Sequence, residues 1–239
     1  MTGPWTISYR KGDVYSHRRT TKFMEHLPNG QDVVRLELRA IERTEVKDVN
    51  AKGEATLAAT CLSMDSLHGG TTERINATSY PSVTRVFGRN GLLIREIDAT
   101  DTGRDPLELV DRLLLNRPTP PESVDNGSVW RTDLPDARRP GKRVTIVSRY
   151  LGTTTSLKIP AIKVTEAFDV DHVPPRTEAI HVKCEMALDP ATGRTIKATT
   201  EIKNVAFAAH GGIVPGEVSI EEELIVPGVN DKESGAPPN

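Results

Sequence analysis

The chain has 239 residues, of which 36% are hydrophobic and 4% aromatic, and its 31 Lys and Arg against 33 Asp and Glu give a net charge of −2. This length allows one large β-domain or two of roughly 115 residues each. The balanced charge and the few aromatic side chains exclude a basic or stacking surface for nucleic acid, and no apolar run could span a membrane. We therefore expect no nucleic-acid partner and no transmembrane segment.

Strand patterns fill the first region, residues 1–104, for which we predict one β-half. Residues 34–46 alternate apolar and charged side chains, and residues 55–64 place Leu, Ala and Cys on one face. Asn29-Gly30 precedes the first of these segments, and both residue types readily adopt the positive φ of a hairpin turn. The low apolar fraction fits antiparallel strands with one solvated face.

A connector follows at residues 105–126. Asp105 is a good N-cap, because its carboxylate can accept from the free amides of a first helical turn, and Pro106 suits the first helical position. Pro118 limits the extension of the helix. We therefore predict one short helix at about residues 106–116, followed by a proline-rich run.

The predicted helix has one apolar face, formed by Leu107, Val110 and Leu114 at helical spacing. About three turns are not stable alone in water, so this face must pack on a sheet. Two interpretations are open. The helix closes the core of a β-domain, as leucine stripes usually do, or it covers a ligand groove.

The second β-half is predicted over residues 127–227. Residues 161–169 and 178–188 alternate clearly, and the run at 189–193 has strong turn chemistry. Residues 228–239 contain few apolar side chains, so we predict a disordered tail.

The two halves match each other in order along the chain. The matched segments are 12–15 with 127–130, 34–46 with 144–157, 55–64 with 161–170, and 89–94 with 192–196. This order predicts a mainly β protein, with one or two strongly curved antiparallel sheets built from duplicated halves. Tyr15 and Trp130 take equivalent positions, and we interpret them as core anchors or, alternatively, as two ligand-stacking residues.

The sequence contains no constellation typical of an enzyme. It has neither a G-x-S-x-G motif nor a glycine-rich phosphate loop that opens a helix. The local cluster of Asp169, Asp171 and His172 lacks a fourth metal ligand. Cys61 and Cys184 lie in alternating strands and are predicted to be buried thiols or one disulfide. We expect no catalysis, no metal and no cofactor.

Short motifs carry a resemblance to a known architecture. They are the G-D-x-Y and G-x-x-W openings, the leucine-rich helix with its proline-rich run, and the D-P-x-T-G-R-x-x-K hairpin, at residues 12–15, 127–130, 107–115 and 189–197. They resemble bacterial exported β-rich proteins with the LolA/LppX-like lipoprotein-carrier architecture. The resemblance implies a strongly curved antiparallel sheet with helices against its concave side.

The first functional hypothesis is a non-enzymatic extracytoplasmic binding or carrier protein for a hydrophobic ligand, held in an apolar groove between sheet and helix. Its candidate ligand-binding residues are Leu107, Val110, Leu114, Tyr15 and Trp130. The alternative is a structural or protein-interaction β-domain with a filled core. Residues 1–5 contain no apolar signal segment, so the protein is either cytoplasmic or exported with its signal removed. The resemblance favours the periplasm or cell envelope.

Overall fold

The computed structural model describes residues 7–76, 82–97, 106–116, 119–120, 123–172, 178–209 and 212–229. Several predictions concern residues outside these ranges, namely the N-cap at Asp105, the helix limit at Pro118, the first five residues and the tail from residue 230.

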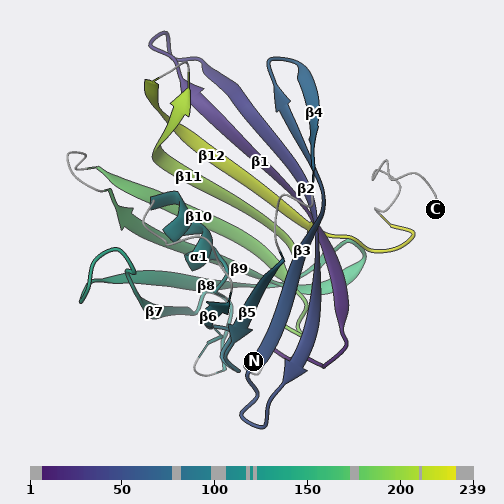
Figure 1. Ribbon diagram of the computed structural model, residues 1–239. Coiled ribbons are helices and arrows are strands. Elements are labelled where there is room, and N and C mark those ends of the chain that lie inside the picture. Colours follow the sequence, from purple (N-terminus) through teal and green to yellow (C-terminus); the bar gives the residue numbers. More distant parts are fainter. Residues whose placement is uncertain are drawn as a thin grey trace.

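Within the described ranges, twelve strands form a single antiparallel sheet (Figure 1). The strands are β1 Val14–His26, β2 Asp32–Val49, β3 Ala55–His68, β4 Thr71–Ile75, β5 Val83–Phe87, β6 Leu93–Ile97, β7 Val129–Pro135, β8 Arg143–Ser156, β9 Ile159–Asp171, β10 Ala179–Leu188, β11 Thr195–Ala209 and β12 Gly212–Leu224. Their order is β6-β5-β3-β2-β1-β12-β11-β10-β9-β8-β7, with β4 paired to β3. The predicted fold class is confirmed, because the described residues form one large, curled antiparallel sheet with one short helix.

The first and the last strand meet in the middle of this sheet. β1 pairs with β12 from His17 opposite Leu224 to Glu25 opposite Gly216. Strands β6 and β7 are the two ends of the sheet, which is curled but not closed. The helix α1, Pro106–Leu114, connects these ends and lies on the concave side (Figure 1). With nine residues it is too short to cross a membrane, and the described residues contain no other helix.

The two halves open with the same backbone arrangement. Gly12 and Gly127 both have a φ of +88°, a value that glycine adopts without strain. The Gly12 amide donates to the Val46 carbonyl at 2.9 Å, and the Gly127 amide donates to the Tyr150 carbonyl at 2.8 Å. The matched segments fall on β1 and β7, β2 and β8, β3 and β9, and the turns before β6 and β11.

The core lies on the concave face, where the alternating patterns place their apolar residues. On β10, Val182, Cys184 and Met186 are buried and the residues between them are exposed, as period 2 requires. Two large clusters fill the half formed by β7–β12. A smaller cluster around Val46, Leu57 and Phe87 lies in the first half. The two halves are therefore filled unequally.

The helix ends where the chain turns back towards β6. The Asn116 side chain donates to the Arg112 carbonyl at 2.9 Å and accepts from the Leu93 amide at 2.8 Å. It thereby satisfies one of the carbonyls that every helix leaves open at its C-terminus. This contact connects α1 to the edge of the first half.

Candidate functional site

The apolar face of α1 packs into the core of the second half. Leu109, Val110 and Leu113 are at most 3% exposed and belong to the large cluster built from β7–β12. Leu107 and Leu114 pack against its margin. Of the two interpretations of the leucine stripe, these contacts match the helix that closes a β-core.

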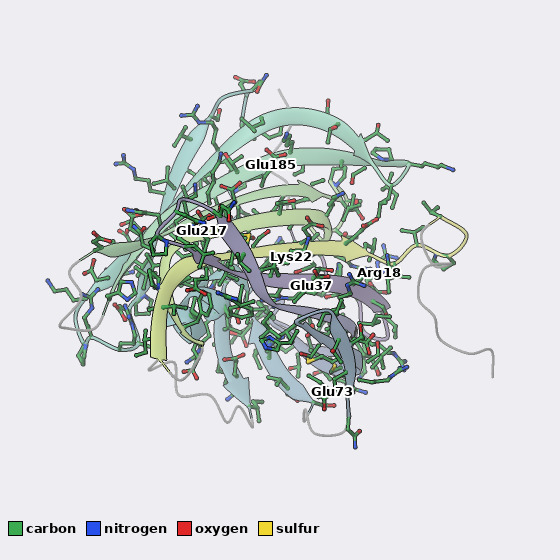
Figure 2. The ribbon with its side chains drawn as sticks, turned by 90° about the horizontal axis from the view of Figure 1, so that it is seen from above. Arg18, Lys22, Glu37, Glu73, Glu185 and Glu217 are labelled. Carbon is green, nitrogen blue, oxygen red and sulfur yellow. The ribbon has the colours of Figure 1, made fainter. Side chains whose placement is uncertain are left out.

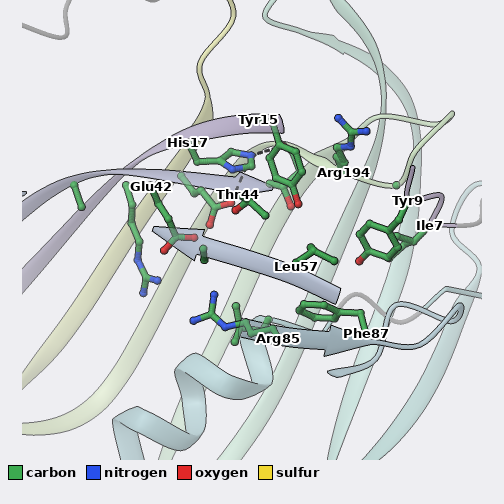
Figure 3. Close-up of a pocket in the computed structure, with 17 residues that line it drawn as sticks. Ile7, Tyr9, Tyr15, His17, Glu42, Thr44, Leu57, Arg85, Phe87 and Arg194 are labelled. Atoms are coloured by element: carbon green, nitrogen blue, oxygen red, sulfur yellow. Dashed lines mark hydrogen bonds and ion pairs between the residues drawn. The ribbon is translucent and has the colours of Figure 1, made fainter. Parts of the chain in front are cut away.

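A cavity of about 180 Å³ lies in the first half, beyond the C-terminal end of the helix (Figure 3). Its walls come from the segment before β1, from β1, β2, β3 and β5, from the turn before β11 and the first residue of β11, from Glu222 on β12, and from Leu115. Among described residues it is the concave site in which aromatic, aliphatic and charged side chains meet. We refer to it as the pocket.

One end of the pocket is apolar and aromatic, formed by Ile7, Tyr9, Leu57 and Phe87. Figure 3 shows these four side chains together at one side. The Tyr9 and Phe87 rings lie 6.3 Å apart between centroids, at 32° to each other. They overlie the small cluster of the first half, so this end is a continuation of the core.

The segment that carries Ile7 is attached to the second half. The Ser8 amide donates to the Thr192 carbonyl at 3.0 Å. Ile7 packs directly on Gly193, whose φ is +68°, and a Cβ at Gly193 would come within 2.7 Å of the Ile7 Cγ1 atom. Glycine is therefore required here for both conformation and space. Residues of the first half and of the second half thus close the pocket together at this point.

The other end of the pocket is charged, and ion pairs hold its arginines. Arg19 Nη2 lies 2.7 Å from Asp111 Oδ1 on α1, and Arg85 Nε lies 3.0 Å from Glu96 Oε1. Glu96 also forms an ion pair with Arg112 of the helix, whose Nε atom lies 3.1 Å from Glu96 Oε2. The polar face of α1 thus contacts the first half, while its apolar face fills the second.

Tyr15 lies between the two ends of the pocket. The Arg194 guanidinium, which pairs with Asp13, lies 4.9 Å above the Tyr15 ring, and the His17 ring contacts it edge-on at 5.5 Å. Burial raises the pKa of Tyr15 to about 12, and the charges of Glu222 and Glu42 raise this pKa further while Arg194 lowers it. The phenol therefore stays protonated at neutral pH.

Alkaline titration should resolve this phenol. Because the pKa of Tyr15 is raised from 10.0 to about 12, the folded state holds its proton more tightly than the unfolded chain. Its contribution to the free energy of unfolding is complete below pH 10 and is lost as the pH rises towards 12. We expect an ultraviolet titration to show one tyrosine with a midpoint near 12 that Tyr15→Phe removes. Loss of a component near 10 instead would contradict the assignment.

The structure separates the five residues predicted from sequence. Tyr15 lines the pocket, whereas Trp130 is 7% exposed and lies in the second large cluster beside Val164 and Met186. Leu114 lines a side cavity of about 40 Å³ between α1 and β12, which shares Arg19 with the pocket. Val110 lies in the large core cluster of the second half, and Leu107 packs against the margin of that cluster.

Sequence reasoning missed the charged residues of the pocket. Arg19 and Glu42 lie on the inward face of their strands, in alternation with His17 and with Thr44. Charged side chains usually mark the solvated face of a strand, so the sequence pattern did not indicate that these two residues line a pocket. For Arg19 the available signal was its period-2 spacing from Tyr15 on the same strand, whereas Glu42 lies on β2 opposite His17 and has no such signal.

The two cysteines are free thiols, so no disulfide joins the halves. Cys184 is buried, and its sulfur accepts a hydrogen bond from the Thr200 hydroxyl at 3.2 Å. Burial, followed by the negative charge of Glu42, raises the pKa of the Cys61 thiol. The Cys61 thiol is therefore held protonated, and so a poor nucleophile, at neutral pH.

The acidic and histidine cluster predicted near residue 170 is divided among different partners. Asp169 contacts His181 at 2.7 Å, Asp171 contacts Arg139 at 2.5 Å, and His172 donates to the Asn204 carbonyl at 2.6 Å. Across the described ranges, no group of three or more His, Cys, Asp or Glu side chains is placed to hold a metal ion.

A larger cleft of about 840 Å³ lies on the outer face over β1 and its neighbours. In the sheet register Lys22 is opposite Glu37 on β2, and Arg18 is opposite Glu223 on β12 (Figure 2). Opposite charges directly across strands stabilise a sheet. This pattern is typical of a solvated outer face, so the inner pocket is the stronger candidate site.

No family model and no curated protein sequence matches the chain. Three solved structures resemble it in chain course. A candidate lipoprotein from Parabacteroides distasonis has a TM-score of 0.36 at 10% identity, covering 92% of this chain and 97% of that one. A candidate exported protein with a YmcC-like fold from Bacteroides fragilis has a TM-score of 0.33 at 12% identity, with 93% and 100% covered. The hypothetical lipoprotein YmcC of Escherichia coli has a TM-score of 0.30 at 14% identity, with 92% and 91% covered. No function is transferred at these TM-scores.

Proposed function

We propose that this protein binds a small, partly apolar ligand in the pocket and catalyses no reaction. One observation carries the proposal: the core of the second half is filled, but the same sheet leaves a cavity of about 180 Å³ in the first half. Ligand sites are typically concave and apolar, with a few polar groups that orient the ligand. The pocket has this composition, with one aromatic and one charged end.

The size of the cavity limits what it can hold. Sites for drug-sized ligands have volumes of about 300 to 1,000 Å³, so the pocket fits a smaller molecule or the end of a longer one. Carriage of a whole lipid, as the LolA/LppX-like resemblance implies, would need α1 to leave the core beneath Leu107, Val110 and Leu114. We therefore propose small-ligand binding as the main function, with carriage of a longer chain as its extension.

The state of the reactive groups supports a non-catalytic function. Burial keeps Tyr15 and Cys61 protonated, because it raises the pKa of each. The His17 Nε2 atom donates to the Thr195 carbonyl at 2.9 Å, so that nitrogen is not available as a base. Tyr15, Cys61 and the His17 Nε2 atom are thus each held in a protonated form that is not a nucleophile or a base.

We also propose that the protein works in the periplasm or cell envelope, on the support of its sequence resemblance to exported carriers. Fractionation of cells that express the gene from its natural start would test this. Recovery in the cytoplasmic fraction alone would contradict it.

Blocking the pocket should abolish binding. Ala59 lines the pocket, whereas Ala58 points to the opposite face of β3. We expect 2-phenylethanol to bind the unaltered protein saturably, Ala58→Leu to bind it equally well, and Ala59→Leu not to bind it. Calorimetry measures the affinity, and amide chemical shifts of pocket residues locate the site. Equal binding by Ala59→Leu would refute the proposal, as would the absence of saturable binding of this alcohol and of its amine and carboxylate analogues to the unaltered protein.

A second function, a structural or protein-interaction domain, is favoured by the packing of α1. Val110 is completely buried and the core beneath the helix is filled, as a purely structural helix requires. Failure of ligand binding, together with a stable Ala59→Leu variant, would support this alternative.

A further inference from the structure

Each arginine that lines the pocket already has an ion-pair partner in the chain, and Arg85 shares its partner with Arg112. Asp111 pairs with Arg19, Glu96 pairs with Arg85, and Asp13 pairs with Arg194. An anionic ligand would have to break one of these pairs, and breaking a pair that is partly removed from water leaves an uncompensated charge. An anion would therefore compete with a carboxylate already present at each guanidinium, although the buried Nε atom of Arg194 has no hydrogen-bond acceptor.

Glu42 differs from these paired residues. It is half-buried in the pocket wall, and among the described side chains it makes no hydrogen bond or ion pair. Its carboxylate acts on its neighbours through charge alone. A carboxylate in a partly dry cavity is most stable when a cation lies against it.

The negative charge of Glu42 affects the pKa of three nearby groups. It contributes to the raised pKa of Tyr15 and of the Cys61 thiol, where burial is the larger cause. Burial alone would lower the pKa of Arg19, but Asp111, with Glu222 and Glu42, raises it. All three effects have the sign of a site that prefers positive charge.

The opposite end of the pocket suits an apolar or aromatic group. Leu57 and Phe87 are 6% exposed there, and Tyr9 stands beside them. Aromatic rings pack well edge-to-face or offset, and an adjacent ring also attracts a cation. A ligand that spans the pocket would place its apolar body at this end and its polar group near Glu42.

We infer that the ligand is a small organic cation, a primary amine on an apolar or aromatic body, and that Glu42 receives its ammonium group. This inference rests on the proposed binding function and names the class of ligand for the same pocket. The ammonium donates hydrogen bonds to the Glu42 carboxylate, and the apolar body displaces water from Leu57, Tyr9 and Phe87.

Three compounds with the same phenyl body test the inference at neutral pH: 2-phenylethylamine is a cation, phenylacetate an anion and 2-phenylethanol neutral. Because a hydrogen bond to a charged group contributes about 1.5 to 3 kcal/mol, the amine should bind at least about tenfold tighter than the alcohol. Glu42→Gln should remove this preference of the amine over the alcohol. Glu45→Gln is the matched control, since Glu45 lies on the opposite face of β2 and pairs with Lys47 at 2.8 Å.

The possible outcomes separate the two proposals. If the alcohol binds in the pocket but the amine binds no tighter, or if phenylacetate binds best, the binding function stands and the inference is wrong. If Glu42→Gln keeps the preference for the amine while its unfolding midpoint is unchanged, Glu42 is not the receptor and the inference is wrong. If none of the three compounds binds, both proposals fail.

Discussion

Replacing Gly216 with alanine is expected to lower the free energy of unfolding by about 3 kcal/mol or more, at the upper end of overpacking effects. Gly216 lies on β12 between Glu25 of β1 and Val205 of β11. A Cβ there would overlap the Met24 carbonyl oxygen and come within 2.7 Å of the Phe207 ring. The obstacle on β1 is backbone, which cannot turn aside as a side chain can.

The position makes this substitution severe. In the described part of the chain, β1 and β12 form the pairing that joins the two halves of the sheet. A Cβ at Gly216 would displace β1, and it would therefore weaken the pairing between the two halves and not merely the local contact with Met24. Urea unfolding followed by circular dichroism measures the change.

Gly228→Ala provides the control. Gly228 has a φ of +75° and open space around it, so alanine should cost only about 1 kcal/mol of backbone strain. If Gly216→Ala were no more destabilising than this control, the close approach of β1 and β12 would be wrong.

The second large effect is expected at the helix. Leu113→Ala should lower the free energy of unfolding by about 2 to 5 kcal/mol, because it leaves a cavity in a filled core. Leu113 is 3% exposed and lies in the cluster that also contains Ile146 and Ile180. Differential scanning calorimetry should show a correspondingly lower melting temperature.

Two comparisons control the helix result. Leu62→Ala, at a side chain 49% exposed, should change the stability little. Asp111→Asn removes the partly exposed pair with Arg19 and should cost at most about 1 kcal/mol. An Asp111→Asn variant less stable than Leu113→Ala would mean that ion pairs, and not the apolar face, hold α1.

The sequence alone predicted part of the candidate site. Tyr15 was singled out and lines the pocket, but Trp130 and the leucine stripe lie in or against the core clusters of the second half. Glu42 and Arg19 could not be selected from local pattern, because what distinguishes them is their contacts. Arg19 pairs with Asp111, 92 residues away. The division into two β-halves at residues 1–104 and 127–227, with a connector between them, stays a prediction.

Local sequence determined the elements of this protein. Period-2 alternation defined which residues of β10 face the core, and glycine turns ended the strands. The spacing of Leu107, Val110 and Leu114 predicted the helix, but its most buried residues are Leu109, Val110 and Leu113, so the predicted face was only partly right. These features depend on neighbouring residues and the geometry of a single strand or helix. The matched order of the two halves was readable for the same reason.

Only the tertiary structure decided how the halves join and where a cavity remains. The pairing of β1 with β12 brings together residues about 200 positions apart, and no local period encodes that choice. The pocket lies where α1, whose apolar face fills the second half, meets the first half through the ion pairs of Asp111 and Arg112. Packing and charge pairing across the whole chain, which no segment specifies alone, therefore set the candidate site.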